Sequence, residues 1–261
     1  QLILSEFGDK SQNIIKNKKV LIIGLGGIGN PVLMYLSSMG FENIGIVEYD
    51  TIELSNLHRQ VIYKESDIGL SKIQCAVNFC KERNSNVKIK TYSLKLTNSI
   101  ALELIRQYDI IVDCTDNIFT RYTINDACVL LGKAYLFGSA IETSGQVGVF
   151  NHNNSPCLRC IYPQNNMPTC ESTGVLGIIP SIIGNLLALE IVKFACNFDG
   201  LLVSKLLNFD LFHGFTIINI PKKNENCIVC SNNAYINLLN YSKLDIYEPR
   251  CVIKNNYDIL R

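Results

Sequence analysis

Residues 20–50 read VLIIGLGGIGNPVLMYLSSMGFENIGIVEYD, and this stretch decides the fold. Its first four residues form a short apolar run, which is typical of a strand buried on both faces of a parallel sheet. Gly24, Gly26 and Gly29 follow with the GxGxxG spacing, and Gly27 is an additional glycine. This spacing between a strand and a helix predicts a turn that binds a nucleotide phosphate.

Each glycine of the turn has its own expected role. Gly24 permits the tight turn, Gly26 and Gly27 let backbone N–H groups approach a phosphate, and Gly29 lets the following helix pack close to the strand. We expect that helix to begin near Asn30, a capping residue followed by proline. Its N-terminus would attract anions.

The second strand, residues 44–47, ends in Glu48-Tyr49-Asp50. In dinucleotide-binding folds an acid about 20 residues after the glycines binds ribose hydroxyls, and Glu48 has this place. The acid favours a nucleotide site over a glycine turn that serves packing alone.

Strands and helices alternate as far as residue 140, which predicts a doubly wound parallel sheet. Beyond Gly145 the pattern changes to antiparallel strands with one long apolar helix. The fold class is therefore α/β, a Rossmann-like doubly wound sheet extended by antiparallel strands. We expect one domain over residues 1–230 and an unassigned tail over 231–261. The remaining expected strands are 87–94, 110–112, 134–140, 146–150, 201–209 and 215–220, and the later helices are 99–106, 121–131 and 178–196.

Composition narrows the class of protein. The chain has 261 residues, enough for a full core, and a formal net charge of +1, which argues against coating nucleic acid or binding a membrane surface. No uninterrupted apolar run reaches about 18 residues and no signal peptide opens the sequence, so we expect a soluble, cytoplasmic protein. Several of the eleven cysteines stand alone in apolar segments, as in a reducing compartment.

Four cysteines form two CxxC pairs, Cys157 with Cys160 and Cys227 with Cys230. Two such pairs supply four thiolates for a tetrahedral Zn²⁺ and leave no position for a substrate water. The pattern predicts a structural zinc site that fastens the C-terminal strands, with redox dithiols or chance pairs as the alternatives.

Three charged residues, Arg59, Lys72 and Asp116, come from separate loops on the carboxyl edge of the expected sheet. Singly, each would be read as a solvated surface charge. Two cations and a carboxylate beside a phosphate turn suit phosphoryl or nucleotidyl transfer, in which cations neutralise phosphate oxygens and the carboxylate holds Mg²⁺.

Cys170 lies in a polar loop, Pro168-Thr169-Cys170-Glu171. It would be a nucleophile if neighbouring cations lowered its pKa, and otherwise an incidental cysteine. His58 beside Arg59 is a candidate base or, alternatively, an orienting group.

GLGGIGN, EYD, LSNLHRQ, GLSK, DCTDN, TRYTINDACVLLGK, SGQVGVF and the two CxxC pairs together resemble the ThiF/MoeB/ubiquitin-activating enzyme family over nearly all of residues 1–230. Residues 107–130 are most similar to the eukaryotic members that activate a ubiquitin-related modifier and the small subunit of molybdopterin synthase. The resemblance implies an ATP-dependent adenylyltransferase. Its expected substrate is a ubiquitin-like sulfur carrier ending in Gly-Gly, which becomes an acyl-adenylate with release of pyrophosphate. A homodimer is also implied, with helix 178–196 in its interface.

The resemblance also assigns roles by motif. Glu48 would bind ribose, Arg59 and Lys72 would contact phosphates, Asp116 would hold Mg²⁺, and Cys170 matches a loop cysteine that captures the activated carrier. An ionised carboxylate needs no general base, so such a site has only to position two anions. The expected ATP contacts are Gly24, Gly26, Gly27, Gly29, Glu48, Asp50, Ser55, Asn56, Arg59, Lys72, Asp116 and Asn117.

Some features depart from the family pattern. The family has an arginine just before the sequence that begins here at Gln1, and we expect it upstream or lost. Residues 231–261 are too few for a rhodanese domain, so sulfur would come from a rhodanese or desulfurase in trans or from a domain beyond the printed chain. The segment before Cys170 is short for the eukaryotic members. Two alternatives are an NAD-dependent dehydrogenase and a non-catalytic subunit that binds a ubiquitin-like protein.

Overall fold

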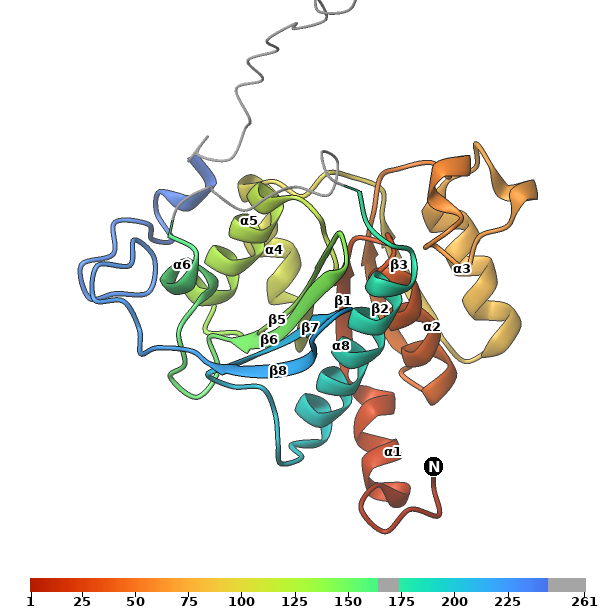
Figure 1. Cartoon of the computed structure of the whole chain (residues 1–261), viewed down its shortest axis with the longest axis horizontal. Coiled ribbons are helices and arrows are strands. Elements are labelled where there is room, and N and C mark those ends of the chain that lie inside the picture. Colours follow the sequence, from red (N-terminus) through yellow and green to blue (C-terminus); the bar gives the residue numbers. More distant parts are fainter. Residues whose placement is uncertain (164–173, 244–261) are drawn as a thin grey trace, which may run out of the picture.

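The computed structural model describes residues 1–163 and 174–243, and its centre is one eight-stranded sheet (Figure 1). The strand order is β3-β2-β1-β4-β5-β6-β7-β8. The strands are β1 (Lys19–Ile23), β2 (Asn43–Val47), β3 (Lys88–Tyr92), β4 (Ile110–Asp113), β5 (Tyr135–Ile141), β6 (Ser144–Phe150), β7 (Lys205–Asp210) and β8 (Gly214–Asn219).

The sheet changes character at β5. Strands β3, β2, β1, β4 and β5 pair in parallel, whereas β6, β7 and β8 continue the sheet in antiparallel pairs. This confirms the expected doubly wound sheet with an antiparallel extension. The chain builds the sheet in one direction from β1 to β2 and β3, and then in the other direction from β1 to β4 and β5. The carboxyl ends of β1, β2 and β4 therefore border the crevice where such sheets bind ligands.

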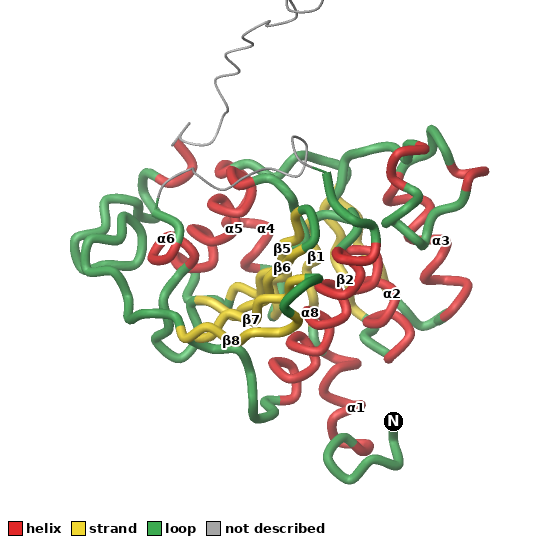
Figure 2. The backbone as a smooth tube through the Cα atoms, in the orientation of Figure 1, coloured by secondary structure: helices red, strands yellow, loops and turns green. Residues whose placement is uncertain are grey.

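Helices cover both faces of the sheet, which makes three layers (Figure 2). Helices α1, α2 and α8 contact one another on one face, and α4 and α5 contact each other on the opposite face. The helices are α1 (Gly8–Asn17), α2 (Gly29–Met39), α3 (Lys72–Arg83), α4 (Asn98–Arg106), α5 (Ile118–Leu130), α6 (Leu158–Ile161) and α8 (Ile178–Cys196), with short 3-10 turns η1 (Leu54–Asn56), η2 (Glu65–Asp67) and η3 (Tyr241–Lys243).

The place of β1 between two helical layers explains why its four buried residues, 20–23, are all apolar. Val20 and Ile22 belong to the core under α2 and α8, and Leu21 and Ile23 belong to the core under α4 and α5. Successive residues of a strand point to opposite faces, so a central strand between two helical layers needs apolar residues at every position.

Helix α8 has the expected bounds and packs against β5, β6 and α2. In the described part of the chain it is the one helix long and apolar enough to cross a membrane, and 56% of its most apolar stretch is buried inside the protein. Helix α8 lies against the sheet as a core helix does, and a buried core helix can be as long and as apolar as a helix that crosses a membrane.

Helix α2 begins at Gly29, with Ile28 as its N-cap, so the prediction that Asn30 caps this helix was wrong. Asn30 is fully buried and bridges two loops instead. Its Nδ2 donates to the Leu25 carbonyl at 2.8 Å, and its Oδ1 accepts the Ile62 N–H at 3.1 Å. Buried in this way, the side chain ties the glycine turn to the loop that carries Arg59.

Residues 231–243 pack onto the helical layer of α4 and α5. Ile236 and Tyr241 are buried in the same core as α4, and the Tyr241 hydroxyl donates to the Thr123 carbonyl at 2.6 Å. This segment therefore continues the folded unit beyond the second pair of cysteines.

Candidate functional site

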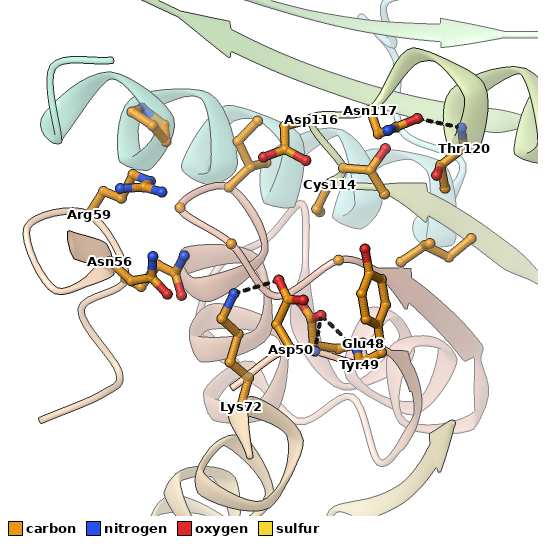
Figure 3. Close-up of a pocket in the computed structure, with 18 of the residues that line it drawn as sticks. Glu48, Tyr49, Asp50, Asn56, Arg59, Lys72, Cys114, Asp116, Asn117 and Thr120 are labelled. Carbon is orange, nitrogen blue, oxygen red and sulfur yellow. Dashed lines mark hydrogen bonds and ion pairs between the residues drawn. The ribbon is translucent and has the colours of Figure 1, made fainter. Parts of the chain in front are cut away.

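A cavity of about 690 Å³ opens at the carboxyl ends of β1, β2 and β4 (Figure 3). Gly29 is the only residue of the expected ATP set that does not line it. The cavity wall includes Gly24, Gly26, Gly27, Glu48, Asp50, Ser55, Asn56, Arg59, Lys72, Asp116 and Asn117.

The glycine turn has both open and crowded positions. Gly24 has φ +92°, in the left-handed region that favours glycine. A Cβ at Gly29 would overlap the Gly24 carbonyl, whereas a Cβ at Gly26 would meet nothing within 4 Å. A Cβ at Gly27 would lie 2.7 Å from Cβ of Pro180 in α8. Packing therefore requires glycine at Gly27 and Gly29, while only a ligand would require it at Gly26.

Glu48 is buried and accepts three backbone hydrogen bonds. Its Oε2 accepts the Leu25 N–H at 2.9 Å, and its Oε1 accepts the N–H groups of Tyr49 and Asp50 at 2.7 and 3.0 Å. The carboxylate therefore holds the glycine turn against the end of β2. Oε1 thus accepts two hydrogen bonds and Oε2 only one, so Oε2 has a further lone pair with which to accept a ribose hydroxyl.

Lys72, at the first turn of α3, is buried beneath the cavity. Its Nζ lies 3.0 Å from Oδ2 of Asp50, whose side chain is half exposed (Figure 3). An ammonium held at this depth is poorly hydrated and has a strong attraction for a phosphate oxygen entering the cavity.

Arg59 lies on the loop that follows η1. Its Nη1 donates to the Ser55 carbonyl at 2.9 Å and lies 2.7 Å from Nε2 of His58. The buried Asn56 accepts the Glu53 N–H through Oδ1 at 3.3 Å. His58 Nε2 thus lies in hydrogen-bond contact with the guanidinium, as expected of an orienting group.

Asp116 and Asn117 follow β4 on the loop that leads into α5. Asn117 is the N-cap of α5, and its Oδ1 accepts the N–H groups of Phe119 and Thr120 at 2.9 and 3.2 Å. Figure 3 shows the Asp116 carboxylate across the cavity from Lys72. The loop thus places one acidic group opposite the cations.

Asp113 and Arg121 form a buried group behind this loop that sequence reasoning missed. Asp113 is fully buried, Arg121 Nε lies 3.9 Å from its Oδ2, and the Tyr135 hydroxyl donates to the same oxygen. Burial raises the pKa of Asp113, and the guanidinium of Arg121 opposes that shift. The available signal was an acid ending an apolar strand, since a buried carboxylate requires a cationic or hydrogen-bonding partner.

Two further cysteines bear on the site. Cys114 lines the cavity, but burial, followed by the nearby Asp113 charge, raises its pKa, which disfavours a reactive thiolate there. Cys170 lies outside the described residues.

The two CxxC pairs meet in space, with all four sulfur atoms within 4.8 Å of one another. The Sγ–Sγ distances are 3.9 Å for Cys157–Cys160, 3.6 Å for Cys157–Cys227 and 3.3 Å for Cys160–Cys230. Zn–S bonds of about 2.3 Å in a tetrahedron put sulfur atoms about 3.8 Å apart. The donor set fits Zn²⁺.

Comparison with known proteins gives consistent results. The chain is 42% identical over 259 residues to the adenylyltransferase and sulfurtransferase MOCS3 of Culex quinquefasciatus. The aligned region covers 97% of this chain and 58% of that protein. The protein of the same name from Dictyostelium discoideum is 43% identical over 250 residues, 93% of this chain and 59% of the relative. The chain thus spans less than two thirds of the length of these relatives.

The crystal structure of Escherichia coli MccB with MccA-N7isoASN has the same fold, with a TM-score of 0.76 at 23% identity over 85% of this chain and 69% of that one. The structure of MccB with ATP gives a TM-score of 0.74 at 24% identity, over 84% and 69%. The family model described as ThiF family matches residues 1–229. The chain belongs to the ThiF family.

Proposed function

We propose that this chain is an ATP-dependent adenylyltransferase that activates the C-terminal carboxylate of a ubiquitin-like sulfur carrier ending in Gly-Gly. The observation that carries the proposal is the presence of Arg59, Lys72 and Asp116 around one cavity with the glycine turn. Membership of the ThiF family and the names of the MOCS3 relatives support it.

In the proposed reaction a carboxylate oxygen of the carrier attacks the α-phosphorus of ATP. The bond from that phosphorus to the oxygen bridging to the β-phosphate breaks, and pyrophosphate leaves with the electron pair. The nucleophile is already ionised, so no base is required. Arg59 and Lys72 offset the repulsion between the two anions. Asp116 would hold Mg²⁺, which would neutralise phosphate charge.

The remaining contacts are proposed by motif and supported by the cavity wall. The turn from Gly24 to Gly29 would bind the phosphates through backbone N–H groups. Glu48 and Asp50 would bind the ribose, and Ser55, Asn56 and Asn117 would complete the polar wall around the phosphate chain.

We further propose that the four cysteines bind a structural Zn²⁺. The support is the sulfur geometry, together with a donor set that leaves no open coordination position. The metal would join α6 to the segment after β8, which are far apart in the sequence.

A homodimer is proposed from apolar surface on one face. Ile178 and Leu189 of α8 and Phe215 and Ile217 of β8 are each more than half exposed. Phe215 and Ile217 pair with two β7 residues, Phe209 and Leu207, that pack against the core covered by α8. Paired residues of neighbouring strands point to the same face, so the exposed residues of β8 and α8 lie on one face of the sheet. Size-exclusion chromatography with light scattering should give twice the chain mass, and Leu189→Lys should shift it to the monomer.

The sulfur-transfer step concerns groups beyond the described residues. We propose Cys170 as the thiol that captures the activated carrier, with sulfur supplied by a rhodanese or desulfurase in trans or by a further domain; within the expected tail 231–261, residues 231–243 belong to the folded unit and so are no part of a linker to such a domain. We propose that the protein carries out this reaction in the cytoplasm.

ATP–pyrophosphate exchange tests the proposal directly. Label should pass from pyrophosphate into ATP only when a carrier ending in Gly-Gly is added, and a carrier without its last glycine should give none. An NAD-dependent dehydrogenase or a non-catalytic binding subunit would show no exchange, and that result would overturn the proposal.

A further inference from the structure

Two buried side-chain atoms lack a hydrogen-bond partner in the described residues, Oε1 of Gln60 and Nε of Arg121, and both residues line the cavity. Unsatisfied buried groups are rare in folded proteins and concentrate at functional sites. Arg121 is the more informative of the two, since it is a charged group only 5% exposed.

The contacts of Arg121 lead to a single loop. Its Nη2 donates to the Thr115 carbonyl at 2.6 Å. Asp113, the acid that faces Arg121, accepts both the backbone N–H and the hydroxyl of Thr115 through Oδ1, at 2.8 and 2.7 Å. Thr115 is therefore held at its backbone N–H, its hydroxyl and its carbonyl by two buried side chains of opposite charge.

The other side of the loop is held separately. Asn117 is bound to the first turn of α5 as its N-cap. Asp116 stands between these two anchored neighbours and directs its carboxylate to the cavity. The position of that carboxylate thus depends on where Thr115 and Asn117 are held.

We propose that Arg121 is a positioning residue of the adenylation site: by holding Thr115 it sets the place at which Asp116 meets the metal–nucleotide complex. This inference rests on the proposed function. Groups behind metal ligands that orient them commonly change metal affinity or activity by about 10–100-fold when mutated.

Lysine is the informative substitution at Arg121. It retains the positive charge beside Asp113 but lacks the planar guanidinium that donates to the Thr115 carbonyl while facing the Asp113 carboxylate. Arg121→Lys should weaken binding of Mn²⁺ with a non-hydrolysable ATP analogue, measured by electron paramagnetic resonance, by about 10-fold or more. Arg83→Lys is the matched control. Arg83 also donates to a backbone carbonyl, that of Phe79, and stacks on its ring, but it lies outside the cavity wall. Its substitution should leave binding unchanged.

A double-mutant cycle separates positioning from other roles. If Arg121 acts through Asp116, the variant Arg121→Lys/Asp116→Ala should bind the Mn²⁺–nucleotide complex no more weakly than Asp116→Ala alone. Additive losses would mean that Arg121 acts independently of Asp116. A less stable Arg121→Lys with unchanged affinity would mean that it only supports the fold. Either result overturns the inference.

Should Arg121→Lys fail to fold, Asp113→Ala tests the same link, because Asp113 holds Thr115 from the opposite side and alanine, unlike asparagine, has no oxygen to accept its N–H and hydroxyl. It should weaken Mn²⁺–nucleotide binding, and unchanged affinity would contradict the inference. Binding of the metal–nucleotide complex needs no carrier. Absence of carrier-dependent exchange in the wild type would therefore count against the proposed function and leave this test valid.

Discussion

Arg159 and Asp126 form a buried ion pair with two contacts, which joins the first cysteine pair to α5. Nε lies 2.7 Å from Oδ1 and Nη2 lies 3.0 Å from Oδ2, and the guanidinium stacks on Tyr122 at 4.0 Å from the ring centroid. Beside it, the Leu158 N–H donates to Asn125 Oδ1 at 2.8 Å. These contacts orient α6 and its cysteines through the protein itself, in addition to any metal.

Arg159→Met should therefore lower the free energy of unfolding by about 3–5 kcal/mol, because it leaves the Asp126 carboxylate buried without its cation. Urea unfolding followed by circular dichroism measures the change. Replacing both partners with apolar residues should recover part of the loss. Lys16→Met, which removes a pair between the exposed Lys16 and the partly buried Glu42, is the control and should cost about 0–1 kcal/mol. Equal losses in the two single variants would contradict a special role for the buried pair.

Cys227→Ser should reduce bound zinc, measured by atomic emission on the purified protein, from one ion per chain to a small fraction. A hydroxyl is a poor replacement for a thiolate in a tetrahedral zinc site. The melting temperature should fall as well, because metal-binding free energy contributes to folding. Cys196→Ser alters a cysteine of α8 outside the cluster and should retain the zinc. Full occupancy in Cys227→Ser would rule out the four-cysteine site.

Alanine at Gly26 and at Gly29 should give opposite results. Gly26→Ala should fold with nearly unchanged stability, since its Cβ would meet no atom within 4 Å. It should bind ATP much more weakly if, as proposed, the phosphates approach the backbone of the turn there. Gly29→Ala should unfold at lower urea, because its Cβ would overlap the Gly24 carbonyl. Isothermal titration with ATP and urea unfolding measure the two effects. Unimpaired ATP binding by Gly26→Ala would remove the turn from the nucleotide site.

Tyr241 provides a test of where the folded unit ends. Tyr241→Ala should cost about 3–5 kcal/mol, the usual loss for a large buried aromatic side chain. Tyr241→Phe, which removes the hydroxyl that donates to the Thr123 carbonyl, should cost about 0.5–1.5 kcal/mol. Tyr235→Ala, at an exposed position of the same segment, should be close to neutral in the same urea assay. A neutral Tyr241→Ala would show that residues 231–243 are dispensable for folding.

Local patterns in the sequence determined much of this protein. The apolar run of β1, the glycine turn and the bounds of α8 follow from residues close together in the chain, because strand and helix periodicity are local properties. The carboxyl ends of parallel strands share one edge, so chain order alone was enough to expect Arg59, Lys72 and Asp116 in one place. Paired CxxC spacing likewise indicated the sulfur cluster, since each half is local.

The tertiary structure decided which partner each buried polar group has. Asn30 reads as a helix cap, yet the loop around Ile62 and the glycine turn enclose it and use both ends of its amide. Arg121 reads as one more helical residue, and only the packing of α5 against β4 and β5 brings it to Thr115 and Asp113. A buried polar group must find a hydrogen-bond partner wherever the fold provides one. Such a partner can lie near in the chain, as Thr115 does for Arg121, or far away, as Ile62 does for Asn30, and residue spacing does not encode which.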